Sequence, residues 1–191
     1  INDYELLLKN NPIWIDRTHG VGILEPDVAL AYGVTGASLR GSGVNWDIRK
    51  SNPYMGYESY DFNVPLGEHG DVYDRYRVRV LELSESRKII LQALDRLPKK
   101  GAFRSDNRKF VPPPRSELAG SMEAVIHHFK LWTEGFDAPD EEVQVSIESP
   151  RGEISCYLHG TGGPKPRRVH FKTPSFMHIA AMPVVSEGLL L

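Results

Sequence analysis

The sequence predicts an α+β protein that is mainly helical, with one long central helix packed by further helices beside a small antiparallel β element. Between Gly67 and Pro98, apolar residues recur at spacings of three, four and seven, the period of a helix with one buried face. A second helical stripe follows Ser116. Residues 143–159 then alternate between apolar and polar side chains about a central turn, which is typical of a hairpin.

The first third of the chain shows only short helical patterns. Residues 2–10 read as the latter part of a helix, and residues 26–33 predict a short helix that begins at Pro26 and closes at Gly33. A short strand is predicted over residues 57–65, just before the long helix.

Glycine is dense between residues 33 and 57, which indicates tight turns or close backbone approaches. A phosphate-binding loop would need a Lys-Ser/Thr pair or a strand-to-helix frame with the right glycine spacing, and neither is present at that spacing. We therefore expect a meandering coil that is held by structural ion pairs among Arg40, Asp47 and Arg49.

The long helix has clear start and stop signals. Asp71 can cap its first turn, and Pro98 ends it. At about 1.5 Å per residue, such a helix is roughly 40 Å long and must be packed along much of its length by other segments or by another subunit. Arg87 falls in its apolar seam. Because a buried arginine needs a carboxylate partner, the favoured interpretation of Arg87 is a structural ion pair.

The next segment is polar, ends in three prolines, and is followed by a helix that begins near Ser116 or Ser121 and ends at Gly135. The adjacent His127 and His128 on this helix suggest a metal ligand pair. Neighbouring residues on a helix point about 100° apart and cannot chelate one ion, so no metal site is predicted.

The hairpin is predicted from residues 143–148 and 153–159, with a third strand over 167–172 and a helix that starts near Thr173. Pro150 suits the first corner of a tight turn and Gly152 its exit, so Arg151 is held out at a rigid tip. A turn arginine is most often a solvated one, but Arg151 is the best functional candidate among the basic residues.

Composition sets limits on function. The chain of 191 residues has no apolar run that could span a bilayer, and its single cysteine excludes a disulfide framework. Residues 75–115 carry 12 basic and 4 acidic side chains, but they lack interleaved aromatic residues, and residues 116–148 carry 8 acidic and 1 basic, so nucleic-acid binding is disfavoured. We expect residues 1–191 to form a single partial domain of a longer polypeptide, because the chain starts at Ile1 and ends in an uncapped apolar run.

Six blocks of sequence, read in order, resemble the family of quinone-site subunits of NADH-quinone oxidoreductase, the respiratory complex I. That family is itself similar to the large subunit of nickel-iron hydrogenases. The blocks are RTHGVGIL, YGVTGASLRGSGVNWDIRKSNPY, GDVYDRYRVR, SMEAVIHHFKLWTEG, SPRGEISCYL and FKTPSFMHIAAM.

The resemblance implies a hydrogenase large-subunit-like fold in an enzyme that passes electrons from NADH, through FMN and iron–sulfur clusters, to quinone, coupled to proton translocation. It implies that quinone is the substrate and that the nearest iron–sulfur cluster belongs to a neighbouring subunit, with no cofactor bound by this chain. The implied partners are the terminal-cluster subunit and the membrane-arm subunits, at the cytoplasmic side of the membrane. The turn Pro150-Arg151-Gly152 matches a family turn that carries Lys or Arg at the quinone cavity.

Two alternatives remain open. The first is the large subunit of a nickel-iron hydrogenase, which would need two Cys-x-x-Cys pairs that this sequence does not contain. The second is a non-catalytic scaffold that docks neighbouring subunits through its long helix. A redox signal on quinone titration would separate catalysis from scaffolding.

Overall fold

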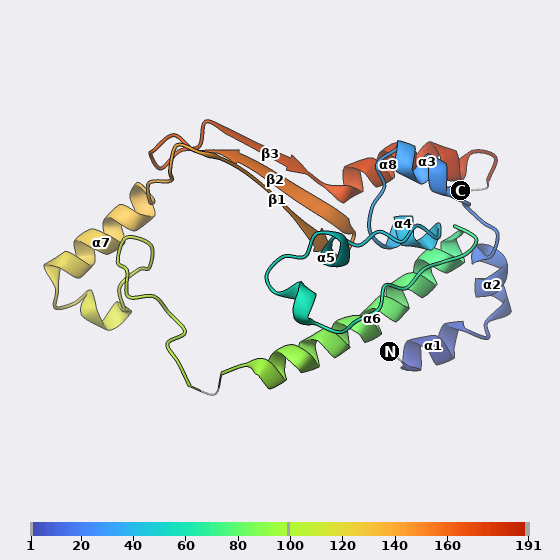
Figure 1. Ribbon diagram of the computed structural model, residues 1–191, viewed down its shortest axis with the longest axis horizontal. Coiled ribbons are helices and arrows are strands. Elements are labelled where there is room, and N and C mark those ends of the chain that lie inside the picture. Colours follow the sequence, from blue (N-terminus) through green and yellow to red (C-terminus); the bar gives the residue numbers. More distant parts are fainter. Residues whose placement is uncertain (1, 99, 190–191) are drawn as a thin grey trace. The chain divides into compact units, whose positions relative to one another are not determined.

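A computed structural model describes residues 2–98 and 100–189, and it confirms the predicted α+β class with one long helix and a small antiparallel sheet (Figure 1). The described chain falls into two compact units. The first comprises Ile1–Leu97, Ser146–Ser155 and Phe171–Leu191, and the second comprises Pro98–Val145 and Cys156–His170. That residues 1–191 form a single domain stays a prediction, because compactness within each unit does not decide whether the two unfold together.

Most of the helices belong to the first unit. They are α1 (Asn2–Leu8), α2 (Pro12–Thr18), α3 (Pro26–Ala31), α4 (Ala37–Gly41), α5 (Ile48–Ser51), a 3₁₀ turn (Tyr57–Ser59), α6 (Val72–Arg96) and α8 (Pro174–Ser186). The second unit contains a 3₁₀ turn (Arg115–Glu117) and α7 (Met122–Thr133). The end of the apolar C-terminal run, residues 190–191, lies outside the described residues.

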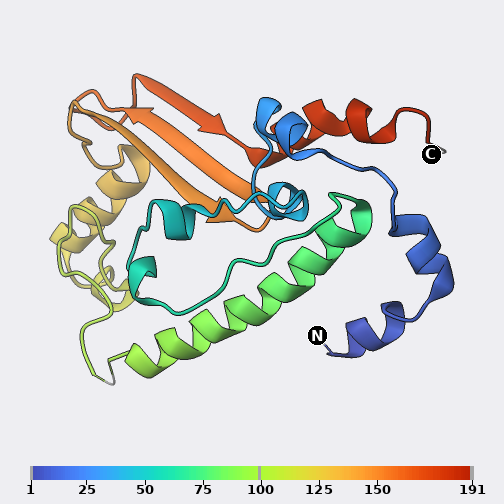
Figure 2. The ribbon, with the colours of Figure 1, turned by 45° about the vertical axis from the view of Figure 1, so that its right-hand side comes forward.

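The core of the first unit lies around the segment that leads into α4. Every residue from 34 to 42 is buried. The core side chains are Leu24, Ala29, Val34, Leu39 and Ala181. In Figures 1 and 2, α4 lies beside the N-terminal half of α6. Their backbones approach closely, since a Cβ added at Gly41 would lie 2.8 Å from Arg75 Cγ.

The predicted start of α6 is confirmed. The Asp71 carboxylate accepts a hydrogen bond from the Asp74 amide at 2.8 Å and a second from the Gly20 amide at 2.8 Å. The C-terminal half of α6 is less covered than its apolar seam predicts. From the middle of the helix to the residue after its end, the seam residues are exposed by 54 to 66%: Leu83, Ile90, Leu94 and Leu97.

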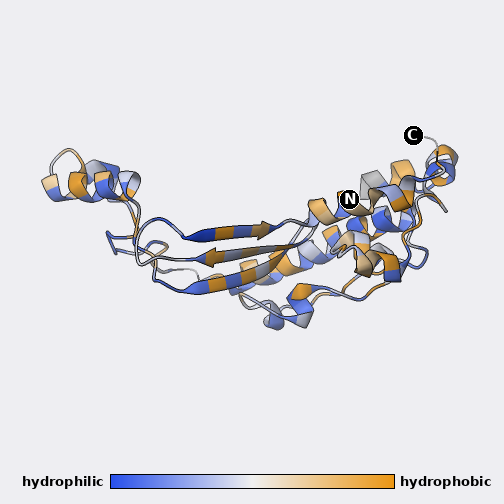
Figure 3. Cartoon of the chain, turned by 90° about the horizontal axis from the view of Figure 1, so that it is seen from above, coloured by the Kyte–Doolittle hydropathy of each residue, from blue (hydrophilic) through white to orange (hydrophobic). Residues whose placement is uncertain are grey.

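Three strands form one sheet in the order β1 (Glu142–Ser149), β2 (Gly152–His159) and β3 (Arg168–Lys172). The two-residue turn between β1 and β2 confirms the predicted hairpin. Hydrophobic and hydrophilic residues alternate along the strands in Figure 3. Val143, Val145 and Ile147 on β1 remain 41 to 51% exposed.

Two local predictions were wrong. The glycine-rich segment from residue 33 to 57 is not a meandering coil, because it contains α4 and α5. The predicted strand over residues 57–65 is instead a 3₁₀ turn followed by irregular chain. Hydrogen bonds to side chains of α6 hold this irregular chain: Gln92 Oε1 accepts from the Asp61 amide and Glu85 Oε2 from the Asn63 amide. These contacts join residues that are far apart in the sequence, so the local alternation of apolar and polar residues does not reveal them.

Within the described residues, no helix combines the length and the apolar character needed to cross a membrane.

Candidate functional site

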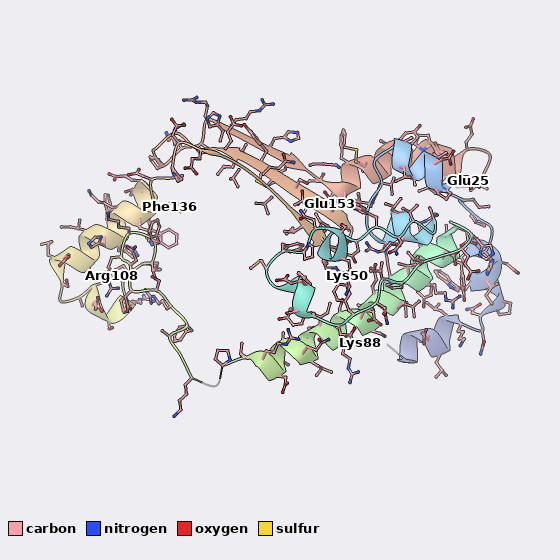
Figure 4. All side chains as sticks on the ribbon, viewed as in Figure 1. Glu25, Lys50, Lys88, Arg108, Phe136 and Glu153 are labelled. Atoms are coloured by element: carbon pink, nitrogen blue, oxygen red, sulfur yellow. The ribbon has the colours of Figure 1, made fainter. Side chains whose placement is uncertain are left out.

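The turn at the end of the hairpin holds Arg151 by its backbone. Ser149 Oγ donates to the Gly152 carbonyl at 2.7 Å, which closes the turn across its base. Gly152 has φ 139°, a conformation that favours glycine, and it is buried. Glu153, labelled in Figure 4, marks the end of the hairpin that carries the turn. The tip therefore has little backbone freedom.

The turn packs directly on the segment that leads into α4. The Glu153 amide donates to Thr35 Oγ1 at 3.0 Å. A Cβ on Gly152 would lie 2.6 Å from Thr35 Oγ1, and a Cβ on Gly36 would overlap the Gly152 backbone. Two glycines from segments far apart in the sequence thus allow the two backbones to touch.

The side chain of Arg151, in contrast, is free. Arg151 is exposed, and it forms no hydrogen bond or ion pair with the described part of the chain. The arrangement is a fixed backbone that presents a single unneutralised cation. The role predicted for Arg151 stays a prediction.

A second arginine near the turn, Arg40, is buried and paired with carboxylates, unlike Arg151. Arg40, at the end of α4, is 2% exposed. Its Nε donates to Glu82 Oε1 of α6 at 2.7 Å, and its Nη2 donates to Glu148 Oε1 of β1 at 2.8 Å. Its Nη1 donates to the Trp46 carbonyl at 3.0 Å and lies 3.9 Å from Asp47 Oδ2. Arg40 thereby joins α4, α6 and the strand that enters the turn.

Asp47 also binds Arg49, the third member of the predicted ion-pair set. Arg49 Nη2 lies 2.6 Å from Asp47 Oδ2, and Arg49 Nε donates to Asp47 Oδ1 at 3.0 Å. Burial alone would raise the pKa of Asp47, but the hydrogen bonds and charge of Arg49, together with Arg40, hold this pKa below its ordinary value. The structure thus brings Arg40, Asp47 and Arg49 together.

Glu148 shows the reverse balance. Burial raises the pKa of Glu148 above its ordinary value, and the attraction of Arg40 offsets only part of that effect. The Glu148 amide donates to the Tyr54 hydroxyl at 2.9 Å, which fixes the strand one residue before the turn begins. Sequence reasoning missed both Glu82 and Glu148 as partners of Arg40.

A pocket of about 420 Å³ lies against this cluster. Its lining residues are Arg40, Arg49, Arg79, Glu82, Leu83, Ser86, Glu148, Ser149 and Pro150. The lining carries three guanidinium groups against two carboxylates, so the wall of the pocket has a small positive excess. Arg79 donates to the Arg75 carbonyl and to Ser38 Oγ rather than to a carboxylate. Arg151 follows directly after the lining residue Pro150 and adds a further positive charge to this part of the chain.

The predicted ion pair of Arg87 is not formed among the described residues. Arg87 is exposed, and no described residue makes an ion pair with it. Spacing correctly places Arg87 between Leu83 and Ile90 on α6, but both of these neighbours are themselves exposed. A structural ion pair for Arg87 therefore stays a prediction, because the seam is not covered by other described residues.

The histidines of α7 form no chelating pair. His127 Nε2 lies 3.7 Å from Glu123 Oε1, one helical turn away. Among residues 2–98 and 100–189, no group of three or more His, Cys, Asp or Glu side chains has a geometry that could hold a metal ion.

Comparison with known proteins identifies relatives over the whole chain. The family model described as "Respiratory-chain NADH dehydrogenase, 49 Kd subunit" matches residues 1–191. The chain is 52% identical over 188 residues to "NADH-quinone oxidoreductase subunit 4" of Thermus thermophilus, a match that covers 98% of this chain and 46% of that protein.

Two further relatives, both D-type subunits of NADH-quinone oxidoreductase, agree. The one from Herpetosiphon aurantiacus is 52% identical over 193 residues, covering 100% of this chain and 46% of that protein. The one from Chloroflexus aurantiacus is 51% identical over 190 residues, covering 98% of this chain and 46% of that protein. The chain spans about half the length of the curated relatives it matches.

Proposed function

The chain belongs to the family of the 49 kDa subunit of respiratory-chain NADH dehydrogenase, and on that basis we propose that it forms part of the quinone-reducing subunit of an NADH:quinone oxidoreductase. In this proposal the enzyme passes electrons from NADH through FMN and iron–sulfur clusters to quinone and couples the reaction to proton translocation. The chain itself binds no cofactor, quinone is the substrate, and the last iron–sulfur cluster is held by a neighbouring subunit.

The observation that carries a specific role is the contrast between Arg151 and Arg40. Arg40 is buried and neutralised by Glu82 and Glu148. Arg151 is exposed on a turn whose backbone is pinned by Thr35 and closed by Ser149. A cation that is carried on a fixed backbone and has no partner among the described residues suits recognition of a ligand on which negative charge develops.

The chemistry follows from Coulomb attraction. Each electron delivered to a quinone adds negative charge to its oxygen atoms. A guanidinium within hydrogen-bond reach stabilises that charge, and the stabilisation is larger where water is excluded and the effective dielectric constant is low. Because the backbone of the turn is already ordered, little backbone freedom is lost when the charge appears. Arg151 would therefore favour electron arrival and help to draw a proton towards the reduced quinone.

We further propose that the subunit docks peripherally at the cytoplasmic side of the membrane, against the terminal-cluster subunit and the membrane-arm subunits. The exposed apolar side chains of α6 support docking, since a protein surface in water rarely leaves a continuous apolar stripe uncovered. Nucleic acid is not a proposed partner.

The same stripe favours one second candidate for the chain by itself: a scaffold that docks neighbours and has no redox activity alone. It is compatible with the quinone role of the whole enzyme. The nickel-iron hydrogenase alternative has no comparable support, because the matched family and the relatives named above are NADH dehydrogenase subunits.

Replacing Arg151 by methionine in the intact enzyme tests the proposal. Loss of a charge-assisted interaction predicts a fall in quinone reductase activity of about tenfold or more. NADH oxidation by an artificial acceptor that bypasses quinone should be unchanged, which shows that the complex has assembled. Arg104→Met is the matched control, since Arg104 is also exposed. Normal quinone kinetics in an assembled Arg151→Met enzyme would refute the role.

A further inference from the structure

We propose that Thr35 is a positioning residue for Arg151, acting by clamping the hairpin turn to the segment before α4. This inference rests on the proposed function of Arg151, and it names the residue that fixes the backbone position of Arg151. Thr35 and Arg151 lie far apart in the sequence, and the residue blocks that suggest the family carry no sign of this connection.

The clamp begins with one hydrogen bond. Thr35 Oγ1 accepts from the Glu153 amide at 3.0 Å, two residues after Arg151. Thr35 is itself buried, so its hydroxyl offers the Glu153 amide a fixed acceptor where water has little access. An amide that loses such an acceptor is left unpaired, and it can regain a partner only if the turn moves.

Close packing makes the bond specific to this position. A Cβ on Gly152 would lie 2.6 Å from Thr35 Oγ1 and 2.9 Å from the Thr35 carbonyl oxygen. The next residue, Gly36, has φ 71°, and a Cβ there would overlap the Gly152 backbone and lie 3.0 Å from the Arg151 carbonyl carbon. The backbones of the two segments are therefore in van der Waals contact on both sides of the hydrogen bond.

A second hydrogen bond holds Thr35 through its backbone. His178 Nε2 of α8 lies 3.1 Å from the Thr35 carbonyl oxygen, and because a carbonyl can only accept, the ring nitrogen donates. Pro174, at the start of the same helix, lies against the Gly152 position. The side chain of Thr35 thus holds the turn, and α8 holds Thr35 by binding the Thr35 backbone carbonyl.

The functional consequence concerns orientation. Arg151 has a long side chain and no partner among the described residues, so only its backbone can define where the guanidinium is presented. When the backbone of Arg151 is held in place before the reaction, less conformational freedom is lost as the reaction proceeds. Small displacements of a reacting or charge-stabilising group lower the rate strongly. Release of the clamp should weaken quinone reduction without removing the charge.

A double-mutant cycle in the intact enzyme tests this inference. Thr35→Val keeps the volume of the side chain and removes the acceptor, and it should lower kcat/KM for quinone about three- to tenfold. Thr35→Ser keeps the hydroxyl and should remain close to wild type. Thr161→Val is the matched control, because Thr161 is exposed and, among the described residues, its hydroxyl bonds only the Lys165 carbonyl.

The decisive comparison uses the Arg151→Met background. If Thr35 acts through Arg151, Thr35→Val should there cost less than about twofold, because interacting sites are not additive. An equal loss in both backgrounds would overturn the clamp, as would a loss in Thr35→Ser equal to that in Thr35→Val. If the valine variant does not assemble, Thr35→Cys, whose sulfur is a weak acceptor, replaces it in the cycle.

The two proposals fail in different ways. If Arg151→Met itself has normal quinone kinetics, the proposed function of Arg151 fails, and the clamp fails with it. If Arg151→Met loses activity but the cycle is additive, the proposed function stands and only the clamp is overturned.

Discussion

Arg40 Nη2 lies 2.8 Å from Glu148 Oε1, and this ion pair joins the buried end of α4 to the strand that leads into the Arg151 turn. Glu82 of α6 binds the same guanidinium through Oε1 at 2.7 Å from Nε. A single buried cation therefore links three segments that meet behind the turn. The position of the turn is set by this network and by the hydrogen bond from the Glu153 amide to Thr35.

Replacing Arg40 by methionine should destabilise the full-length subunit strongly. The change leaves Glu148, Glu82 and Asp47 without their shared cation, and breaking a buried ion pair on one side costs about 3–5 kcal/mol. The free energy of unfolding from denaturant titration measures the effect. Arg104→Met, at an exposed position, should change it by less than about 0.5 kcal/mol. A similarly small change at Arg40 would show that the network contributes little.

His178 predicts a pH dependence of stability. Burial lowers the pKa of His178 below its ordinary value of 6.5, Arg79 lowers it further, and the bond to the Thr35 carbonyl offsets part of the shift. The folded protein therefore binds this proton less readily than the unfolded chain. The stability contributed by neutral His178 is complete above pH 6.5 and is lost as the pH falls towards the lower folded pKa.

In that range the free energy of unfolding should fall by at most about 1.4 kcal/mol per pH unit on account of this residue. His178→Gln should remove this part of the slope between pH 7.5 and 5, whereas His170→Gln, at an exposed position, should leave it unchanged. Identical slopes in wild type and His178→Gln would contradict the assignment.

Gly36→Ala tests the contact between the α4 segment and the turn. Gly20 is the matched control, because it has nearly the same φ, 69° against 71°, but a Cβ there would meet nothing within 4 Å. Both changes carry the backbone cost of a positive φ. Gly36→Ala adds a clash with Gly152 and the further cost of its ψ of −150°, a conformation almost confined to glycine at positive φ. The extra destabilisation should be about 1–3 kcal/mol by denaturant titration. Equal losses at the two glycines would mean that the segments separate at no cost.

Local signals account for what the sequence predicted correctly. The apolar spacing, the Asp71 cap and Pro98 all act within α6 or at its ends, so the helix could be predicted with nearly its observed bounds. The Ser149–Gly152 turn is likewise decided by residues next to one another. α4 and α5 were missed because helices of 5 and 4 residues carry too little periodicity to recognise and are held by tertiary contacts.

The site was predictable only in part, for the same reason. Pro150 and Gly152 identified Arg151 as the tip of a rigid turn. A buried Arg40 implied carboxylate partners, but Glu82 and Glu148 lie 42 and 108 residues away along the chain. Thr35 lies 118 residues from Glu153 and carried no signal at all. The apolar spacing on α6 predicted that Arg87 is buried, but among the described residues nothing covers that face of the helix, and Arg87 is exposed.

In the proposed function, the positive charge of Arg151, rather than its bulk, serves quinone reduction. The most direct measurement compares kcat/KM for quinone in intact Arg151→Lys and Arg151→Gln enzymes, which differ chiefly in charge. Lysine should retain activity within about tenfold of wild type, since it keeps the cation but not the forked geometry, and glutamine should fall clearly below lysine. Equal activities of the lysine and glutamine enzymes would contradict the account.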